Sequence, residues 1–225
     1  MLAPADLFDL TQTEHAAIFE GCTYAWEALT RINECLRTKL CPGLHNQCQG
    51  TAWIGDQVSI GEGTVLEDGV MIKGPAIIGR NCQIRHNAYI REHVIVGDNC
   101  VVGNASELKN ALLFNHAVVP HFNYVGDSIL GYKVHLGAGV KVSNFRLVPG
   151  NIYVEVEGKP FDTGLRKFGA LVGDGAEIGC NAVLNPGSVI GRHSVVYANT
   201  NWRGILPAHR VAKNRAEIEI VERRQ

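Results

Sequence analysis

The sequence lacks the features that define several classes of protein. No apolar run approaches the roughly 20 residues of a membrane-spanning helix, and the first residues have neither the basic nor the apolar stretch of a secretory signal peptide. An excess of positive charge is also missing, since 21 Lys and Arg stand against 22 Asp and Glu. We therefore expect neither a membrane partner nor binding of nucleic acid through bulk charge.

Disulfide-forming motifs are absent as well. The seven cysteines are odd in number and form no Cys-x-x-Cys pair, so a secreted disulfide scaffold is not indicated and a cytoplasmic location is expected. Only 19% of the residues are charged, but 46% are apolar, which is ample for a packed core. The length of 225 residues is typical of one or two domains.

A large apolar residue recurs every six residues over much of the chain. Glycine is also frequent, at 25 of 225 residues, which indicates many tight turns. The first run of apolar positions comprises Ile54, Ile60, Leu66, Ile72, Ile78, Ile84, Ile90, Val96, Val102, Leu108 and Phe114. The frame breaks near residue 120 and resumes at Leu130 and Leu136, and again from Val172 to Val196. A period of six fits a short strand plus a corner, so three units predict one coil of a parallel β-helix.

The repeat also predicts how the chain is divided. Residues 51–200 would form the β-helix, and residues 201–225 a charged C-terminal extension. Residues 1–50 would form a helical cap, because apolar residues have helical spacing over 13–40, and this cap would protect the open edge of the first coil. Residues 145–170 interrupt the repeat and are expected to form a hairpin-like loop ejected from the coils.

Three cations are spaced by the length of one coil. Lys73, Arg91 and Lys109 are separated by 18 and 18 residues, so they would stack about 4.8 Å apart along the helix. Like charges at that spacing repel by roughly a kcal/mol per pair even in water, unless an anion binds them. We therefore predict a phosphate or diphosphate site; the alternative is three solvated side chains that relax apart.

A specific order of residues follows this ladder. Glu107 and Lys109 form Glu-x-Lys, His121 comes twelve residues after the lysine, and Tyr124 and Asp127 follow in His-x-x-Tyr-x-Gly-Asp. The pattern is completed by Arg91 upstream, by Leu-Gly-Ala-Gly at 136–139, and by Asn144 and Lys167 downstream. Over residues 50–200 this order resembles the acetyltransferase domain of the bifunctional N-acetylglucosamine-1-phosphate uridylyltransferases.

The resemblance implies a homotrimeric left-handed β-helix that transfers acetyl from acetyl-CoA to the amine of an amino-sugar phosphate, such as glucosamine-1-phosphate, or of a sugar nucleotide. It implies that His121 is the general base and that no metal takes part. The substrate-binding residues would be Arg91, Lys109, Tyr124, Asn144 and Lys167, with Lys73 from the ladder and His135. Ala138, Cys180 and Ala198 would lie along the thioester and pantetheine, where a backbone N–H would stabilise the oxyanion.

The sequence departs from the family pattern in three places. His135 stands where the family has the first Asn of Asn-Ile-Gly-Ala-Gly, and the loop at 145–170 is longer than its counterpart. Residues 1–50 contain no Gly-rich nucleotide loop, so we expect no nucleotidyl transfer. We therefore expect a different acceptor pocket.

Two other functions remain open on the sequence. The first is a non-catalytic module that binds a sugar nucleotide. The second is a metal enzyme similar to the γ-class carbonic anhydrases, because His116 and His121 have the spacing of two of its ligands, although His86 is out of phase as a third. Trp202 would either stack on a nucleotide base or pack over the last coil.

Overall fold

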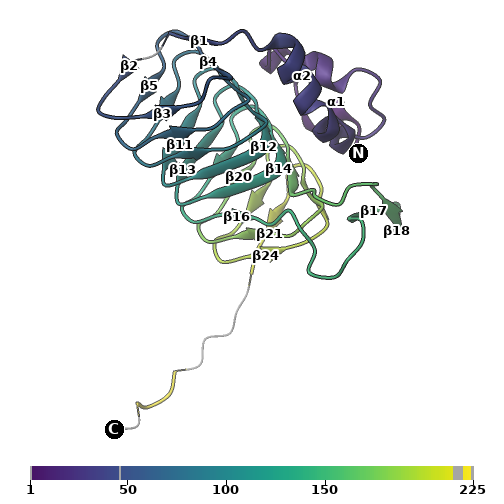
Figure 1. The fold of residues 1–225 in the computed structure, drawn as a ribbon. Helices are drawn as coiled ribbons and strands as arrows, with labels where there is room; N and C mark the ends of the chain where they lie inside the picture. Colours follow the sequence, from purple (N-terminus) through teal and green to yellow (C-terminus); the bar gives the residue numbers. More distant parts are fainter. Residues whose placement is uncertain (1, 46, 215–219, 224–225) are drawn as a thin grey trace.

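The computed structural model describes residues 2–45, 47–214 and 220–223. The chain forms a left-handed parallel β-helix, and a helical N-terminal segment lies along one side of it (Figure 1). Among the described residues, no helix is long and apolar enough to cross a membrane.

The N-terminal segment is a series of short helical turns. Its elements are α1 (Pro4–Leu7), η1 (Leu10–Gln12), η2 (Ala16–Phe19), η3 (Ala25–Arg31) and α2 (Ile32–Lys39). The single helix expected over 13–40 is therefore wrong in detail, because only α2 within that stretch is α-helical and the rest forms 3-10 turns. Gly21, with φ of 69°, lies in the break between η2 and η3, where a left-handed backbone favours glycine.

The coils have three sides. We name each side after one of its strands: the β13 face, the β9 face and the β10 face. The β13 face consists of β2 (Gln47–Cys48), β5 (Val65–Leu66), β8 (Gln83–Ile84), β11 (Val101–Asn104), β13 (Val118–His121), β15 (His135–Leu136), β20 (Glu177–Ile178), β23 (Val195–Val196) and β26 (Val211–Ala212).

One sheet wraps the other two sides, because β12 (Glu107–Leu113) and β14 (Tyr124–Leu130) run across the corner between them. The β9 face also contains β3 (Trp53–Ile54), β6 (Met71–Ile72), β9 (Tyr89–Ile90), β16 (Lys141–Val142), β21 (Val183–Leu184) and β24 (Asn201–Trp202). The β10 face also contains β1 (Gly43–Leu44), β4 (Val58–Ile60), β7 (Ala76–Ile78), β10 (Val94–Val96), β19 (Ala170–Val172), β22 (Ser188–Ile190) and β25 (Ile205–Leu206). Thus the coils continue past residue 200, and the charged tail expected to pack outside them lies partly outside the described residues.

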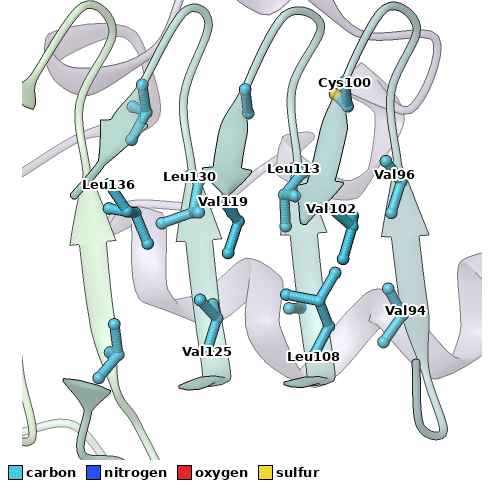
Figure 2. Packing of buried hydrophobic residues seen from close by; sticks show 14 of the residues in the cluster. Val94, Val96, Cys100, Val102, Leu108, Leu113, Val119, Val125, Leu130 and Leu136 are labelled. Atoms are coloured by element: carbon cyan, nitrogen blue, oxygen red, sulfur yellow. The ribbon is translucent and has the colours of Figure 1, made fainter. Parts of the chain in front are cut away.

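The six-residue frame places the core as predicted up to Leu108. Ile72, Ile90 and Leu108 are paired in register and fully buried, and Figure 2 shows such side chains stacked inside the coils. The frame then slips by one residue, because Leu113 rather than Phe114 points inward. The expectation for Phe114 was therefore wrong.

The slip comes from shorter coils. Leu108 pairs with Val125, and Val125 with Val142, so two successive coils have 17 residues rather than 18. At their corners Asn110 and Asp127 adopt a left-handed backbone, with φ of 43° and 48°. The break in the repeat thus begins about ten residues earlier than the sequence indicated.

The N-terminal segment covers the β10 face and not the end of the first coil, so the predicted end cap is wrong. The outward residues of this face are apolar and belong to one buried cluster with the segment, which contains Ile95, Leu112, Ile129, Leu171 and Val189 from the coils and Trp26, Leu29, Ile32 and Leu36 from the segment. Burying this apolar row is strongly favourable, whereas one open strand edge offers little apolar surface.

The predicted hairpin is confirmed. β17 (Tyr153–Val156) and β18 (Lys159–Asp162) pair antiparallel within the loop that leaves the coils. The hairpin folds back onto the N-terminal segment, where the Phe161 ring lies 4.8 Å from that of Tyr24 and 5.9 Å from that of Trp26. Together, the segment and the hairpin leave the β9 and β13 faces uncovered.

We expect the substitution Ile90→Ala to lower the free energy of unfolding by about 2–5 kcal/mol, since it removes a fully buried side chain from a close-packed stack. Met71→Ala on the same face is the control, because Met71 points outward and is 36% exposed; its effect should stay within about 0.5 kcal/mol. Chemical denaturation followed by circular dichroism measures both. Equal effects would contradict the assigned inward and outward positions.

Candidate functional site

The stacked coils bring the three cations of the ladder into one column. Met71, Tyr89 and Glu107 pair in register, so Lys73, Arg91 and Lys109 occupy equivalent places on successive coils, at the corner between the β9 and β10 faces. All three side chains are partly exposed, at 38%, 32% and 21%. The geometry expected from the 18-residue spacing is therefore present.

Each cation of the ladder also has a carboxylate partner, which the sequence analysis missed. Lys73 Nζ lies 3.4 Å from a Glu92 oxygen, and Arg91 Nη1 donates to Glu107 at 2.9 Å. Glu92 also lies 3.6 Å from Arg91 Nε. These pairs offset the mutual repulsion of the ladder. The Nε of Arg91 is buried and makes no hydrogen bond. The side chain as a whole is 32% exposed, and its guanidinium has N–H donors besides the one on Nη1 that bonds Glu107.

Asp127 organises a cluster beside Lys109. Its carboxylate is buried, lies 3.4 Å from Lys109 Nζ, and accepts hydrogen bonds from Asn110 Nδ2 at 2.9 Å and from Asn144 Nδ2. Since both asparagines and the lysine donate to one carboxylate, their positions are fixed before any ligand arrives. We call Lys109, Tyr124, Asp127 and Asn144 the Asp127 cluster.

Tyr124 completes this cluster. A Cβ at Gly126 would lie 2.6 Å from Tyr124 Oη and 2.6 Å from Asn144 Nδ2, so only glycine permits the two side chains to approach here. Burial raises the pKa of Tyr124, and the charges of Glu107 and Asp127 raise it further. The phenol therefore remains protonated at neutral pH and can donate a hydrogen bond.

His121 lies one corner away from the Asp127 cluster. It ends β13 with its side chain exposed, Phe122 turns the corner with φ of 53°, and Tyr124 begins β14 on the next face. The pairing of Val118 with His135 places Ala138 beside His121. His121 is thus at the corner that separates the β13 and β9 faces.

The same corner carries all three residues expected at the thioester. The registers of β15, β20 and β23 stack Ala138, Cys180 and Ala198 above His121 in that order. We call these four residues the His121 edge. Cys180 and Ala198 are exposed, so small side chains line the edge.

Backbone donors remain free along the His121 edge. The amides of Gly139, Asn181 and Asn199 donate to the carbonyls of the preceding coil at 2.8–2.9 Å. In the part of the chain that the structure describes, the amides of the edge residues Ala138, Cys180 and Ala198 make no such bond. A free N–H beside a small side chain is suited to hold a developing oxyanion.

Lys167 and His135 differ in their placement. Lys167 is exposed and forms a β-bridge with Phe145, and the next amide, that of Phe168, donates to the Asn144 carbonyl at 3.0 Å. Lys167 therefore lies beside the Asp127 cluster. His135 is instead an outward residue of the β13 face, between Val118 and Glu177, and the structure does not bring it to this cluster.

The remaining candidates are placed as follows. Trp202 packs against the core and donates from Nε1 to the Gly204 carbonyl at 3.1 Å. Of the two roles expected for Trp202, the structure therefore agrees with packing over the last coils. His116 lies before the other end of β13, edge-on to Tyr132, with ring centroids 5.6 Å apart. Within residues 2–45, 47–214 and 220–223, no three His, Cys, Asp or Glu side chains are grouped to hold a metal ion.

Comparison with known proteins agrees with this arrangement. Residues 72–159 match the family model described as the GMPPB C-terminal domain. A bifunctional protein GlmU from Methanococcus maripaludis is 38% identical over 176 residues, which are 78% of this chain and 42% of that protein. This chain is similar in sequence to part of the bifunctional GlmU proteins. The resemblance read from its motifs is therefore confirmed.

Further matches cover smaller parts of known proteins. A bifunctional sugar-1-phosphate nucleotidylyltransferase/acetyltransferase from Sulfurisphaera tokodaii is 35% identical over 91 residues, 40% of this chain and 23% of that protein. This chain thus spans less than half of either relative. Among solved structures, an Arabidopsis UDP-N-acetylglucosamine acyltransferase aligns with 79% of this chain over 70% of its own length. The two chains are 14% identical and the TM-score is 0.46, so this likeness carries no argument about function.

We expect Asp127→Ala to lower the free energy of unfolding by about 1–3 kcal/mol, because the amides of Asn110 and Asn144 lose their buried acceptor. Glu155→Ala is the control, since that carboxylate is exposed on the hairpin. Chemical denaturation of both variants measures the difference. A stability of Asp127→Ala equal to that of the control would show that the carboxylate does not organise the cluster.

Proposed function

We propose that this chain is an N-acetyltransferase that moves an acetyl group from acetyl-CoA to the amine of an amino sugar carrying an anomeric phosphate. The observation that supports this most is the placement of His121 on an edge with free backbone amides, one corner from the Asp127 cluster. In this proposal the base, the oxyanion donor and the polar sugar site serve one acceptor that lies across the β9 face. Its relation to bifunctional sugar-phosphate enzymes accords with this assignment.

The reaction needs one base and one oxyanion donor. His121 accepts a proton from the acceptor amine, whose nitrogen attacks the thioester carbonyl carbon. The carbonyl oxygen becomes an oxyanion held by a free amide of the His121 edge, for which Ala138 is the nearest. The carbon–sulfur bond then breaks, the CoA thiolate leaves with the proton, and an acetamide remains. The chemistry requires no metal.

The acceptor would be held by Arg91 and Lys109 of the ladder and by the Asp127 cluster. Arg91 and Lys109 would donate to the phosphate, because both cationic side chains are partly exposed. Tyr124, Asn144 and Lys167 donate to the sugar hydroxyls. Because the Asp127 carboxylate already fixes Lys109 and Asn144, little order is lost when the sugar binds.

The acyl donor would lie along the His121 edge. The column of Ala138, Cys180 and Ala198 is long, has small side chains and presents backbone N–H groups, which fits a thin pantetheine chain and its thioester. CoA supplies the activated acetyl group, so the protein contributes alignment and a base.

The proposal includes a cytoplasmic homotrimer. All seven cysteines are free thiols, in accordance with a reducing compartment. The N-terminal segment and the hairpin do not cover the β9 and β13 faces, which carry exposed apolar residues, among them Met71 and Val211. A neighbouring copy packed there would close the corner at His121 and exclude water from the reaction.

We expect His121→Ala to lower turnover by about 10²–10⁴-fold, the range for loss of a general base. The assay measures thiol release from acetyl-CoA with glucosamine-1-phosphate, and circular dichroism checks the fold. His209→Ala is the control, because His209 is an exposed corner residue that stacks on His193. Retained turnover would remove His121 from the role of base. Sugar-nucleotide binding without any turnover in the native protein would favour the non-catalytic module.

We expect Cys180→Tyr to raise KM for acetyl-CoA at least tenfold, since a phenol would fill the middle of the His121 edge, while the affinity for glucosamine-1-phosphate stays unchanged. Cys41→Tyr is the control, because Cys41 is equally an exposed thiol but lies before the first coil. Steady-state kinetics and calorimetry separate the two effects. An unchanged KM would place the acyl donor elsewhere.

A further inference from the structure

The cation ladder extends beyond the residues that a sugar phosphate needs. Lys109 belongs to the Asp127 cluster and Arg91 lies one coil before it, whereas Lys73 lies one coil further toward the N-terminus. Beyond it the ladder ends in a hollow of about 470 Å³, lined by Trp53, Ile54, Gly55, Asp56, Gln57, Lys73 and Gly74. Nothing in the proposed function uses Lys73, Trp53 or this hollow.

The two substrates must extend in opposite directions from His121. The free amides of the His121 edge belong to coils on its C-terminal side, so the acyl donor occupies that direction. The hollow lies on the N-terminal side, between the coil of Lys73 and the coil of Trp53, which are one and two coils beyond Arg91. Since one coil rises about 4.8 Å, Trp53 lies about 10 Å from Arg91 along the helix, which one phosphate cannot span.

Trp53 is unusual among the tryptophans. Trp26 is 1% exposed and Trp202 packs against the core, whereas Trp53 is 54% exposed on the β9 face at the rim of the hollow. A nucleobase stacks well on an exposed indole. Asp56 and Gln57, on the same rim, offer an acceptor and an amide to a ribose or a base edge.

Lys73 is suited to a second phosphate. Its pair with Glu92 joins two side chains that are each 38% exposed, and such pairs contribute little to stability, so an anion can replace the carboxylate. Lys73 lies on the coil before that of Arg91, about 4.8 Å away along the column. Two successive cations at this spacing match two linked phosphates.

We propose that the acceptor of this chain is a nucleoside-diphosphate-linked amino sugar. Arg91 and Lys109 hold the phosphate attached to the sugar, Lys73 holds the second phosphate, and the base stacks on Trp53 in the hollow. This inference rests on the proposed function for the sugar end, but the nucleotide end stands on the hollow and the ladder alone.

Binding to the full chain tests the nucleotide end. Isothermal calorimetry with UDP, GDP and dTDP should show that at least one of them binds, and Trp53→Ala should weaken that binding about 5- to 100-fold, the range for loss of a base stack. Lys73→Gln should weaken it as well, while both variants bind glucosamine-1-phosphate as the native protein does. Tyr153→Ala and Lys159→Gln, exposed hairpin positions, are the matched controls and should change nothing.

The outcomes separate this inference from the proposed function. Absence of nucleotide binding, or a Trp53→Ala variant that binds within twofold of the native protein, would overturn the inference, and acetylation of glucosamine-1-phosphate would still support a transferase. Nucleotide binding that depends on Trp53, without acetyl transfer to any amine, would support the hollow and reject the transferase. Light scattering is the last check, because an oligomer that dissociates on Trp53→Ala would make Trp53 an interface residue and the inference wrong.

Discussion

The hydrogen bonds between successive coils are the constraint on which the rest of this structure depends. The amide of one residue donates to the carbonyl of the residue just before its equivalent on the next coil, as in the bonds from Lys73 N to Ile90 O at 2.8 Å and from Arg91 N to Leu108 O at 2.9 Å. Residues about 18 positions apart therefore become neighbours. The cation ladder and the His121 edge are both columns of such neighbours, and they lie at the two corners that flank the β9 face.

Much of this arrangement could be predicted, because the period of the apolar residues is a direct consequence of the coil. Ile90 and Leu108 could be placed inside, and the cations spaced by 18 could be placed in line. The slip to Leu113 could not be seen, since Leu113 and Phe114 are both apolar and either satisfies the pattern. The sequence did contain a sign that the β10 face is covered, and it was overlooked. Where two adjacent residues are both apolar, as Ile95 and Val96 are, one side chain points into the coils and the other points outward, and both are buried.

The site was predicted less completely than the fold, for a physical reason. Motif order predicts on which coil a residue lies, and the structure brings His121 and Ala138 together on successive coils, but their roles stay predictions. It does not say which side chains pair across a corner, so the contact of Lys73 with Glu92, 19 residues on, escaped notice. Motif order also does not show on which face of the coil a residue lies when it differs from the family pattern. His135 was expected at the acceptor, but it lies on the β13 face and not at the Asp127 cluster.

The N-terminal segment changes how a solenoid of this kind holds together. In most repeat proteins a coil touches only its nearest neighbours, and the ends fray independently. Here Leu7 accepts a hydrogen bond from the Asp174 amide at 3.0 Å, while Glu14 pairs with Arg80 at 2.6 Å, so one strap bridges coils whose sequences are more than 90 residues apart. Separation of the coils between Arg80 and Asp174 must therefore also break contacts of the strap, so we expect this part of the β-helix to unfold more cooperatively than a solenoid without a strap.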